Sequence, residues 1–89
     1  MEKSAQQVQV ERIRNFMRGR LGARQVYNDK LVGGRRSIKA AGCGFKTAAA
    51  AQRAADRMHE RFGVETAVVK TYHPIYGLTR LAVRAYVPA

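Results

Sequence analysis

The sequence predicts one small α+β domain over residues 1–89, with the element order α-β-β-α-β-β. Three observations lead to this fold class: a well-capped amphipathic helix in the middle of the chain, a second helical pattern near its start, and two stretches of β-type pattern broken by turn residues. The expected architecture is an antiparallel sheet of about four strands with helices packed on it.

The central helix is predicted over residues 47–63. Thr47 is suited to the N-cap and Gly63 to the position that ends the helix. Apolar residues recur at the i, i+4, i+7 and i+11 spacing that forms one stripe of a helix, namely Ala51, Ala55, Met58 and Phe62. This stripe should face the core, while Arg53, Arg57 and Arg61 follow one another on another face.

A first helix is predicted over residues 5–18. Ser4 and Gln7 have the spacing of a capping box, and Gly19 and Gly22 are expected to end the helix. Its apolar stripe consists of Val10, Ile13, Met17 and Leu21.

Residues 23–45 are predicted to form a first hairpin. Gly33-Gly34 is a suitable turn, Asn28-Asp29 is a competing one, and the register therefore stays open.

A second hairpin is predicted over residues 64–88, with a loop at residues 73–77 and Pro88 ending the last strand. Alternation gives the last strand an apolar side that should pack on the helix, made of Leu81, Val83, Ala85 and Val87. The other side of this hairpin is expected to show Lys70, Tyr72, Arg80, Arg84 and Tyr86.

The charge balance favours a polyanionic partner. The chain has 17 Lys and Arg against 6 Asp and Glu, for a net charge of +11, and most of the cations are arginines. The guanidinium group matches phosphate and carboxylate oxygens bidentately. The excess is concentrated in residues 1–46, so the first helix and first hairpin should carry most of the positive field.

Several function classes find little support. The one cysteine, Cys43, cannot form an internal disulfide, and no membrane span or signal peptide is evident, so a cytoplasmic location is expected without membrane binding. Cys43, His59 and His73 are scattered among glycines, charges and a loop, which suggests neither catalysis nor a metal site. We therefore expect a protein that is not an enzyme and that needs no cofactor. Dimerisation would help to stabilise so small a domain.

The strongest functional signal is a basic surface with aromatic residues in it. Arginine and lysine would neutralise phosphates, and Tyr72 and Tyr86 could stack on unpaired bases. Gly42 and Gly44 before the central helix allow a phosphate contact there with Lys46, although a strand end that needs glycine for a tight turn explains them equally well. The candidate nucleic-acid-binding residues are Arg12, Arg14, Arg18, Arg24, Arg35, Arg36, Lys39, Lys46, Lys70, Tyr72, Arg80 and Arg84.

Two known families share a local pattern with this chain. The segment GCGFKTAAAAQRAADRM resembles the end of a double-stranded-RNA-binding domain, where glycine and lysine precede an alanine-rich helix that contacts phosphates; the similarity rests on Gly42, Gly44, Lys46, Ala54 and Ala55. GFKT followed by an alanine-rich helix also resembles the arm-binding domain of phage-type integrases. A Ser-Lys-Lys run is missing, and a predicted hairpin follows the helix where the first of these families ends, so no family is assigned.

The function expected from these patterns is non-enzymatic binding of DNA or RNA, with phosphate contacts from the first helix and first hairpin and little base specificity. An alternative is an inhibitor of the kind that phages and plasmids encode, such as an anti-CRISPR or anti-restriction protein, which would dock on an acidic surface or in a nucleic-acid groove of a host complex. A third is an assembly protein whose basic surface makes subunit contacts.

Overall fold

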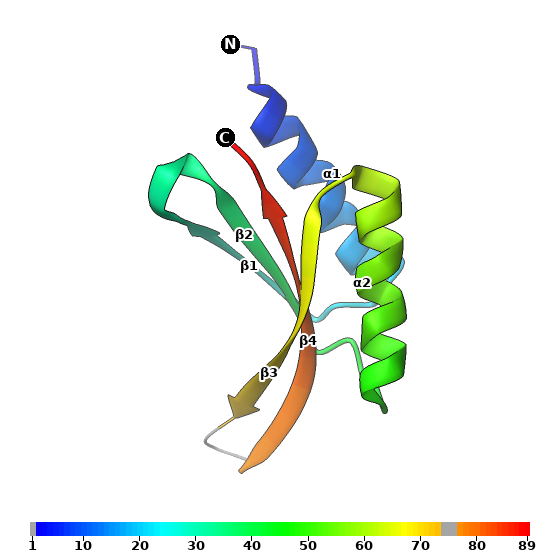
Figure 1. The fold of residues 1–89 in the computed structure, drawn as a ribbon. Coiled ribbons are helices and arrows are strands. Elements are labelled where there is room, and N and C mark those ends of the chain that lie inside the picture. The colour runs from blue at the N-terminus through cyan, green and yellow to red at the C-terminus, as the bar shows by residue number, and fades with distance from the viewer. Residues whose placement is uncertain (1, 74–76) are drawn as a thin grey trace.

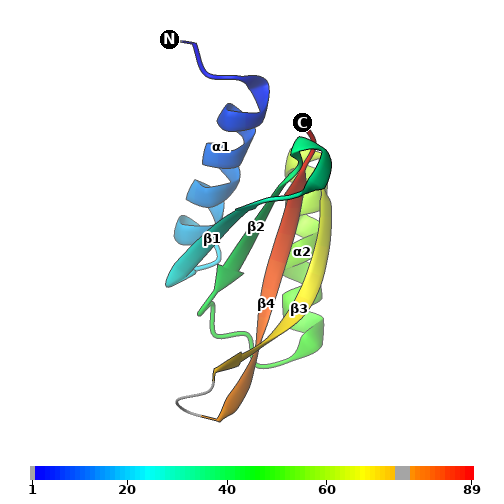
Figure 2. The ribbon, with the colours of Figure 1, turned by 90° about the vertical axis from the view of Figure 1, so that its left-hand side faces the viewer.

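The computed structural model describes residues 2–73 and 77–89, and it confirms the predicted α+β fold. Two helices cover one side of a four-stranded antiparallel sheet, and no helix covers the other side in the described part of the chain (Figure 1, Figure 2). The strand order is β1-β2-β4-β3, so β2 and β4 are central and the two hairpins meet between them.

Helix α1 (Ala5–Gly19) begins at the predicted capping box. The Ser4 hydroxyl accepts a hydrogen bond from the backbone of Gln7, and the Gln7 side chain accepts one from the backbone of Ser4. Val10, Ile13 and Met17 are buried, as the apolar stripe predicts, and Leu21 is partly buried beyond the end of the helix. Gln6 fastens the start of α1 to the first hairpin, because its amide donates a 2.7 Å hydrogen bond to the Gly34 carbonyl.

The first hairpin consists of β1 (Gln25–Lys30) and β2 (Arg36–Ala41), joined through the short 3₁₀ helix η1 (Val32–Gly34). The turn lies at Gly33-Gly34, where both residues have positive φ angles of 83° and 80°. Glycine adopts these angles without the steric cost that a Cβ atom would add. The competing turn residues, Asn28 and Asp29, lie within β1.

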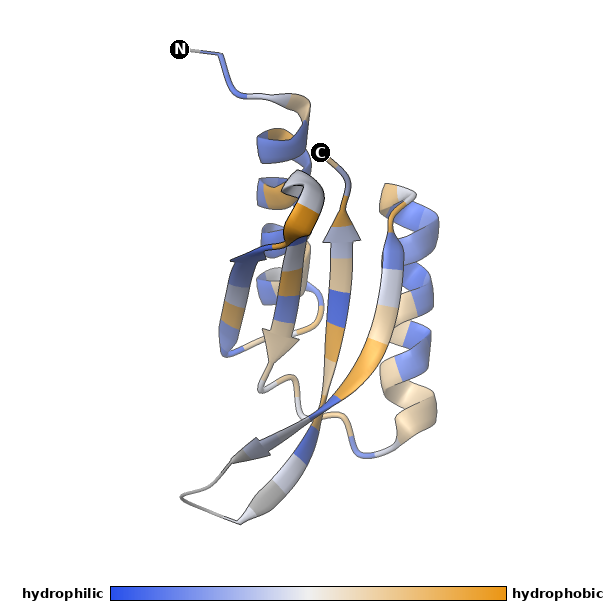
Figure 3. Ribbon diagram, turned by 60° about the vertical axis from the view of Figure 1, so that its left-hand side comes forward, coloured by the Kyte–Doolittle hydropathy of each residue, from blue (hydrophilic) through white to orange (hydrophobic). Residues whose placement is uncertain are grey.

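Helix α2 (Ala48–Phe62) has the predicted ends. The Thr47 hydroxyl accepts a hydrogen bond from the backbone of Ala50, and Gly63 ends the helix in the left-handed conformation. Its buried side consists of small residues and one methionine: Ala51, Ala54, Ala55 and Met58. Arg53, Arg57 and Arg61 are exposed, and hydrophilic bands run along both helices in Figure 3.

The second hairpin consists of β3 (Glu65–His73) and β4 (Leu78–Val87), and Pro88 follows the end of β4 as predicted. Most of the predicted loop, residues 74–76, lies outside the described residues. Val68 pairs with Val83, and the far part of the hairpin projects past the N-terminal start of α2 (Figure 1).

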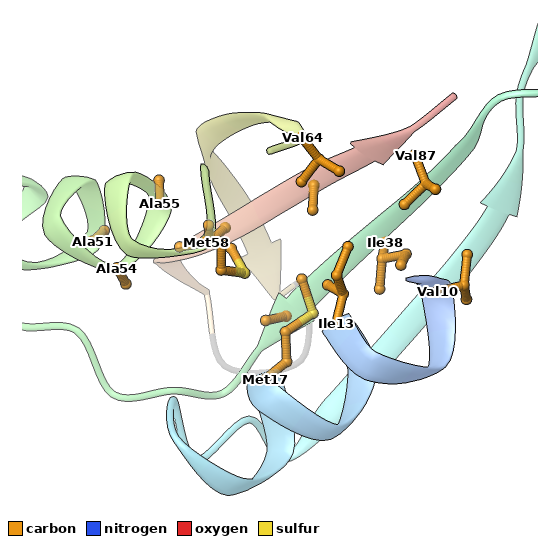
Figure 4. Packing of buried hydrophobic residues seen from close by; sticks show 13 residues of the cluster. Val10, Ile13, Met17, Ile38, Ala51, Ala54, Ala55, Met58, Val64 and Val87 are labelled. Atoms are coloured by element: carbon orange, nitrogen blue, oxygen red, sulfur yellow. The ribbon is translucent and has the colours of Figure 1, made fainter. Parts of the chain in front are cut away.

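The core lies between the helices and the sheet. Helix α1 packs mainly on β2 and to a lesser extent on β1 and β4, while α2 packs on β3 and β4. Ile13, Met17 and Met58 converge between the two layers (Figure 4), and all three are fully buried. Burying a side chain of this size contributes about 1.5 to 3 kcal/mol each, so these residues hold both helices on the sheet.

Candidate nucleic-acid interface

The side of the sheet away from the helices, here called the open face, carries mostly polar side chains. Paired residues of neighbouring strands point to the same side of a sheet, so the register gives rows of side chains across it. One row contains Asp29, Ser37, Tyr86 and Glu65 in the order of the strands, and the next contains Tyr27, Lys39, Arg84 and Ala67. Beyond them on the same face, Val69 pairs with Ala82 and Thr71 pairs with Arg80.

Arg84 occupies the centre of the open face. Its Nη1 atom donates a 2.6 Å hydrogen bond to the Ser37 hydroxyl and lies 3.8 Å from the carboxylate of Asp29. The Arg84 side chain is 25% exposed, whereas Ser37 is only 1% exposed although no helix covers it. Long side chains on the open face therefore cover the small residues beneath them.

Each of the two tyrosines on the open face has a cation over its ring. The Lys39 ammonium lies 4.8 Å from the centre of the Tyr27 ring, and the Arg35 guanidinium lies 5.2 Å from the centre of the Tyr86 ring. Both distances are within the range of cation–π attraction. Arg35 also forms a 3.4 Å ion pair with Glu65. Tyr27 is 43% exposed, and Tyr86 is half-buried.

A second cationic region lies between α1 and the first hairpin, on the helix side of the sheet. Arg14 of α1 and Arg36 of β2 line a groove of about 240 Å³ together with Asn28, which we call the α1–β1 groove. Lys3 and Glu11, which form a 2.8 Å ion pair with each other, also line it. The Nε atom of Arg14 is buried and has no hydrogen-bond partner among the described residues. Two arginines thus line the groove, and the unpartnered Nε of one of them is buried beneath its surface.

A third cationic region lies between the two helices. Arg12 of α1 and Arg20, which directly follows α1, line a hollow of about 580 Å³ with Arg61 of α2. The rings of Phe16 and Phe62 pack edge to face with their centres 5.5 Å apart. The Arg61 guanidinium lies 5.6 Å from the centre of the Phe16 ring and 5.8 Å from that of Phe62.

Lys46 and Arg80 come together at the start of α2. They line a pocket of about 270 Å³ between the segment that precedes α2 and strand β4. Gly42 and Gly44 line the same pocket with φ angles of 74° and 75°. Gly42 has a structural reason to be glycine, because a Cβ atom there would lie 2.9 Å from Cβ of Arg24. At Gly42, directly after β2, the positive φ and the close approach of Arg24 thus account for glycine without any phosphate contact.

The predicted binding residues are therefore distributed over several surfaces instead of one. Arg35, Lys39, Arg80 and Arg84 share the open face, whereas Arg14 and Arg36 share the α1–β1 groove. Arg18 is exposed on the outer side of α1 near Arg14, and Arg12 faces the hollow between the helices. Arg24 is exposed just before β1, where its backbone N–H bonds to Ala41.

The predicted grouping of Lys70 and Tyr72 with Arg80, Arg84 and Tyr86 is wrong. Lys70 pairs with Leu81 and Tyr72 pairs with Thr79, so both side chains point to the helix side of the sheet. They remain exposed there, with Tyr72 at 62%, because this part of the hairpin extends past α2. A shift of one residue in register exchanges the faces of a strand, and the sequence did not determine the register.

Sequence reasoning also missed Tyr27 and Arg61. Tyr27 pairs with Lys39, and the two residues are equally distant from Gly33, so a hairpin centred on that glycine would have placed Tyr27 on the face of Lys39. Arg61 was assigned only to the outer face of the central helix, and nothing in the local pattern signals its contact with Phe16 of α1.

Few of the cations are neutralised within the fold. In residues 2–73 and 77–89, three of the 17 lysines and arginines have an acidic partner: Lys3, Arg35 and Arg84.

Burial raises the pKa of the Cys43 thiol above its ordinary value. No three His, Cys, Asp or Glu side chains gather as metal ligands in the part of the chain that the structure describes. Over the same residues, no helix has both the length and the apolar character needed to span a membrane.

No family model, curated protein or solved structure matches this chain. The functional argument therefore depends on the geometry and charge of the surfaces described above.

Proposed function

We propose that this protein is a non-enzymatic nucleic-acid-binding protein that contacts phosphates through arginines and lysines of α1 and the first hairpin. The observation that carries the proposal is the surplus of cations without acidic partners: fourteen of the 17 lysines and arginines form no ion pair within the described residues. Phosphate neutralisation releases condensed counterions and yields affinity that does not depend on base sequence. DNA and RNA both offer this chemistry.

The α1–β1 groove is the part of the surface best suited to a phosphate. Arg14 and Arg36 come from different elements and line the same groove, so two guanidinium groups can approach one backbone segment. A phosphate in this groove would accept hydrogen bonds from the Nη atoms of Arg14 and Arg36, which a guanidinium group can donate bidentately. Lys3, which also lines the groove, is paired with Glu11, so the two arginines are the main contacts.

The test compares two pairs of charge-removing substitutions. In the first variant Arg14→Gln is combined with Arg36→Gln in the α1–β1 groove, and in the matched control Arg53→Gln is combined with Arg57→Gln on the exposed side of α2. Both variants lose two positive charges. Binding of a labelled oligonucleotide would be measured by gel shift or anisotropy at several salt concentrations.

The wild-type protein should bind more weakly as salt rises, and the groove variant should lower the salt slope by about two, as expected for two lost phosphate contacts. The control should retain the wild-type slope. Equal losses in the two variants would contradict a localised site and leave only diffuse attraction.

An oligonucleotide that stays unshifted by micromolar protein at low salt would reject nucleic-acid binding. The cationic surface would then fit an acidic protein partner, as the inhibitor alternative requires. That alternative would become the hypothesis to test.

A further inference from the structure

The open face combines aromatic rings with cations in a fixed arrangement that the α1–β1 groove lacks. Tyr27 and Tyr86 lie on strands separated by β2, with Lys39 and Arg84 in the row of Tyr27. From the usual spacings of strands and residues in a sheet, the two tyrosines are about 12 Å apart. Neighbouring stacked bases are about 3.4 Å apart, so the distance between the two tyrosines spans more than three base steps. Each ring would therefore stack on a different base.

The charges of the open face suit a nucleic-acid backbone near these rings. Four cationic side chains lie on it, namely Arg35, Lys39, Arg80 and Arg84. The two carboxylates on the same face, Asp29 and Glu65, are each within 4 Å of an arginine. They are therefore partly neutralised, and the face keeps a net positive charge.

We propose that the open face binds single-stranded nucleic acid, with Tyr27 and Tyr86 as the residues on which unpaired bases stack. The proposal rests on the function proposed above and specifies its substrate class. Stacking on an exposed ring requires a base whose flat face is free, and only unpaired bases offer it. A base on Tyr27 would place its phosphate near Lys39, and a base on Tyr86 would place its phosphate near Arg35.

The dimensions of the sheet disfavour a duplex on this face. Four strands span about 14 Å between the outer strand axes, whereas the major groove of B-DNA is about 12 Å wide and accepts an α-helix or a two-stranded ribbon. A duplex would therefore meet the open face only along its backbone, and the tyrosines would contribute no stacking.

The experiment measures binding to labelled dT20 and to a 20-base-pair duplex at 50 mM salt. The wild-type protein should bind dT20 more tightly than the duplex. Tyr27→Leu combined with Tyr86→Leu should weaken dT20 binding by about thirtyfold or more, since two stacked bases are lost and each contributes at least about 1 kcal/mol. Duplex binding should stay unchanged. Tyr72→Leu is the matched control, because this exposed tyrosine lies on the helix side of the sheet, and it should leave both affinities unchanged.

A second measurement covers the case in which the leucine variant does not fold. The chain has no tryptophan, so its ultraviolet emission comes from tyrosine, and stacking of dT20 on Tyr27 and Tyr86 should quench it. With Tyr27→Phe and Tyr86→Phe the quenching should disappear while the affinity for dT20 stays near that of wild type, because phenylalanine retains the ring.

The possible outcomes separate the two proposals. Tighter binding of the duplex, or equal dT20 affinity in the leucine variant and the Tyr72 control, would overturn single-strand stacking and leave phosphate binding standing. Unchanged quenching in the phenylalanine variant would overturn it as well. Failure to bind either oligonucleotide at 50 mM salt would overturn both proposals together.

Discussion

Arg84 donates a 2.6 Å hydrogen bond to the hydroxyl of Ser37, a residue that is buried on the side of the sheet that carries no helix. Arg84 thus shields the sheet from solvent with its aliphatic stem and also carries a charge at its tip. Its side chain is 25% exposed. An arginine with this role contributes to folding and can also meet a ligand.

Replacing either partner of this contact should lower the free energy of unfolding, by a different amount for Ser37 and for Arg84. Ser37→Ala should lower the free energy of unfolding by about 1 kcal/mol, the usual net value of one hydrogen bond. Arg84→Ala should cost more, because it leaves the Ser37 hydroxyl without this donor and uncovers the sheet beneath it. Urea unfolding followed by circular dichroism would measure both. An Arg84→Ala protein as stable as the Ser37→Ala protein would show that Arg84 does not cover the sheet.

The two glycines before α2 provide a second prediction. Gly42→Ala and Gly44→Ala both place a Cβ atom on a residue with positive φ, which costs about 1 to 2 kcal/mol. Only Gly42 also lacks space, since its Cβ would lie 2.9 Å from Cβ of Arg24, whereas nothing lies within 4 Å at Gly44. Gly42→Ala should therefore be the more destabilising change, by roughly 1 to 3 kcal/mol of added steric cost.

Thermal or urea unfolding of the two glycine variants side by side would test this difference. Equal stabilities would mean that Arg24 moves away at little cost, and the close approach between the two segments would then be unimportant.

Cys43 predicts a dependence on pH. Burial raises the pKa of its thiol, so alkylation by iodoacetamide should be slower than for an unfolded chain at the same pH and should reach half of its maximal rate at a higher pH. Because the unfolded chain deprotonates first as pH rises, the contribution of this thiol to stability is complete below the unfolded pKa and is lost as pH rises through the folded pKa. Rates measured from pH 7 to 10, with and without denaturant, would show the shift. Identical pH profiles in the two conditions would contradict it.

The sequence predicted the helices well because their signals are local. Ser4, Gln7, Thr47 and Gly63 act on backbone groups within a few residues, and the structure confirms all four roles. The turn at Gly33-Gly34 was one of two alternatives that the sequence offered, and positive φ angles favour glycine at the turn itself.

The sheet face could not be predicted, because it depends on how distant segments align. The alternation of β3 was recognised, but the pairing of Val68 with Val83 decides which of its residues join Arg84, and local patterning does not contain that information. The same gap hid Tyr27, whose partner Lys39 lies on the next strand. The role of the cationic residues stays a prediction, and their distribution over several surfaces depends on the packing of α1 and α2 on the sheet, which the sequence does not show.

The alanines of α2 constrain which substitutions the chain can accumulate. Ala51 and Ala55 are fully buried, so a larger side chain at either position would push the whole helix outward and disturb Met58 and Val83 with it. In a saturation library selected only for folding, these positions should therefore stay small, while the neighbouring Arg53 and Arg57 should accept almost any polar residue. Over evolution, the buried positions of α2 would then stay small, while the charged residues on its exposed side would change freely.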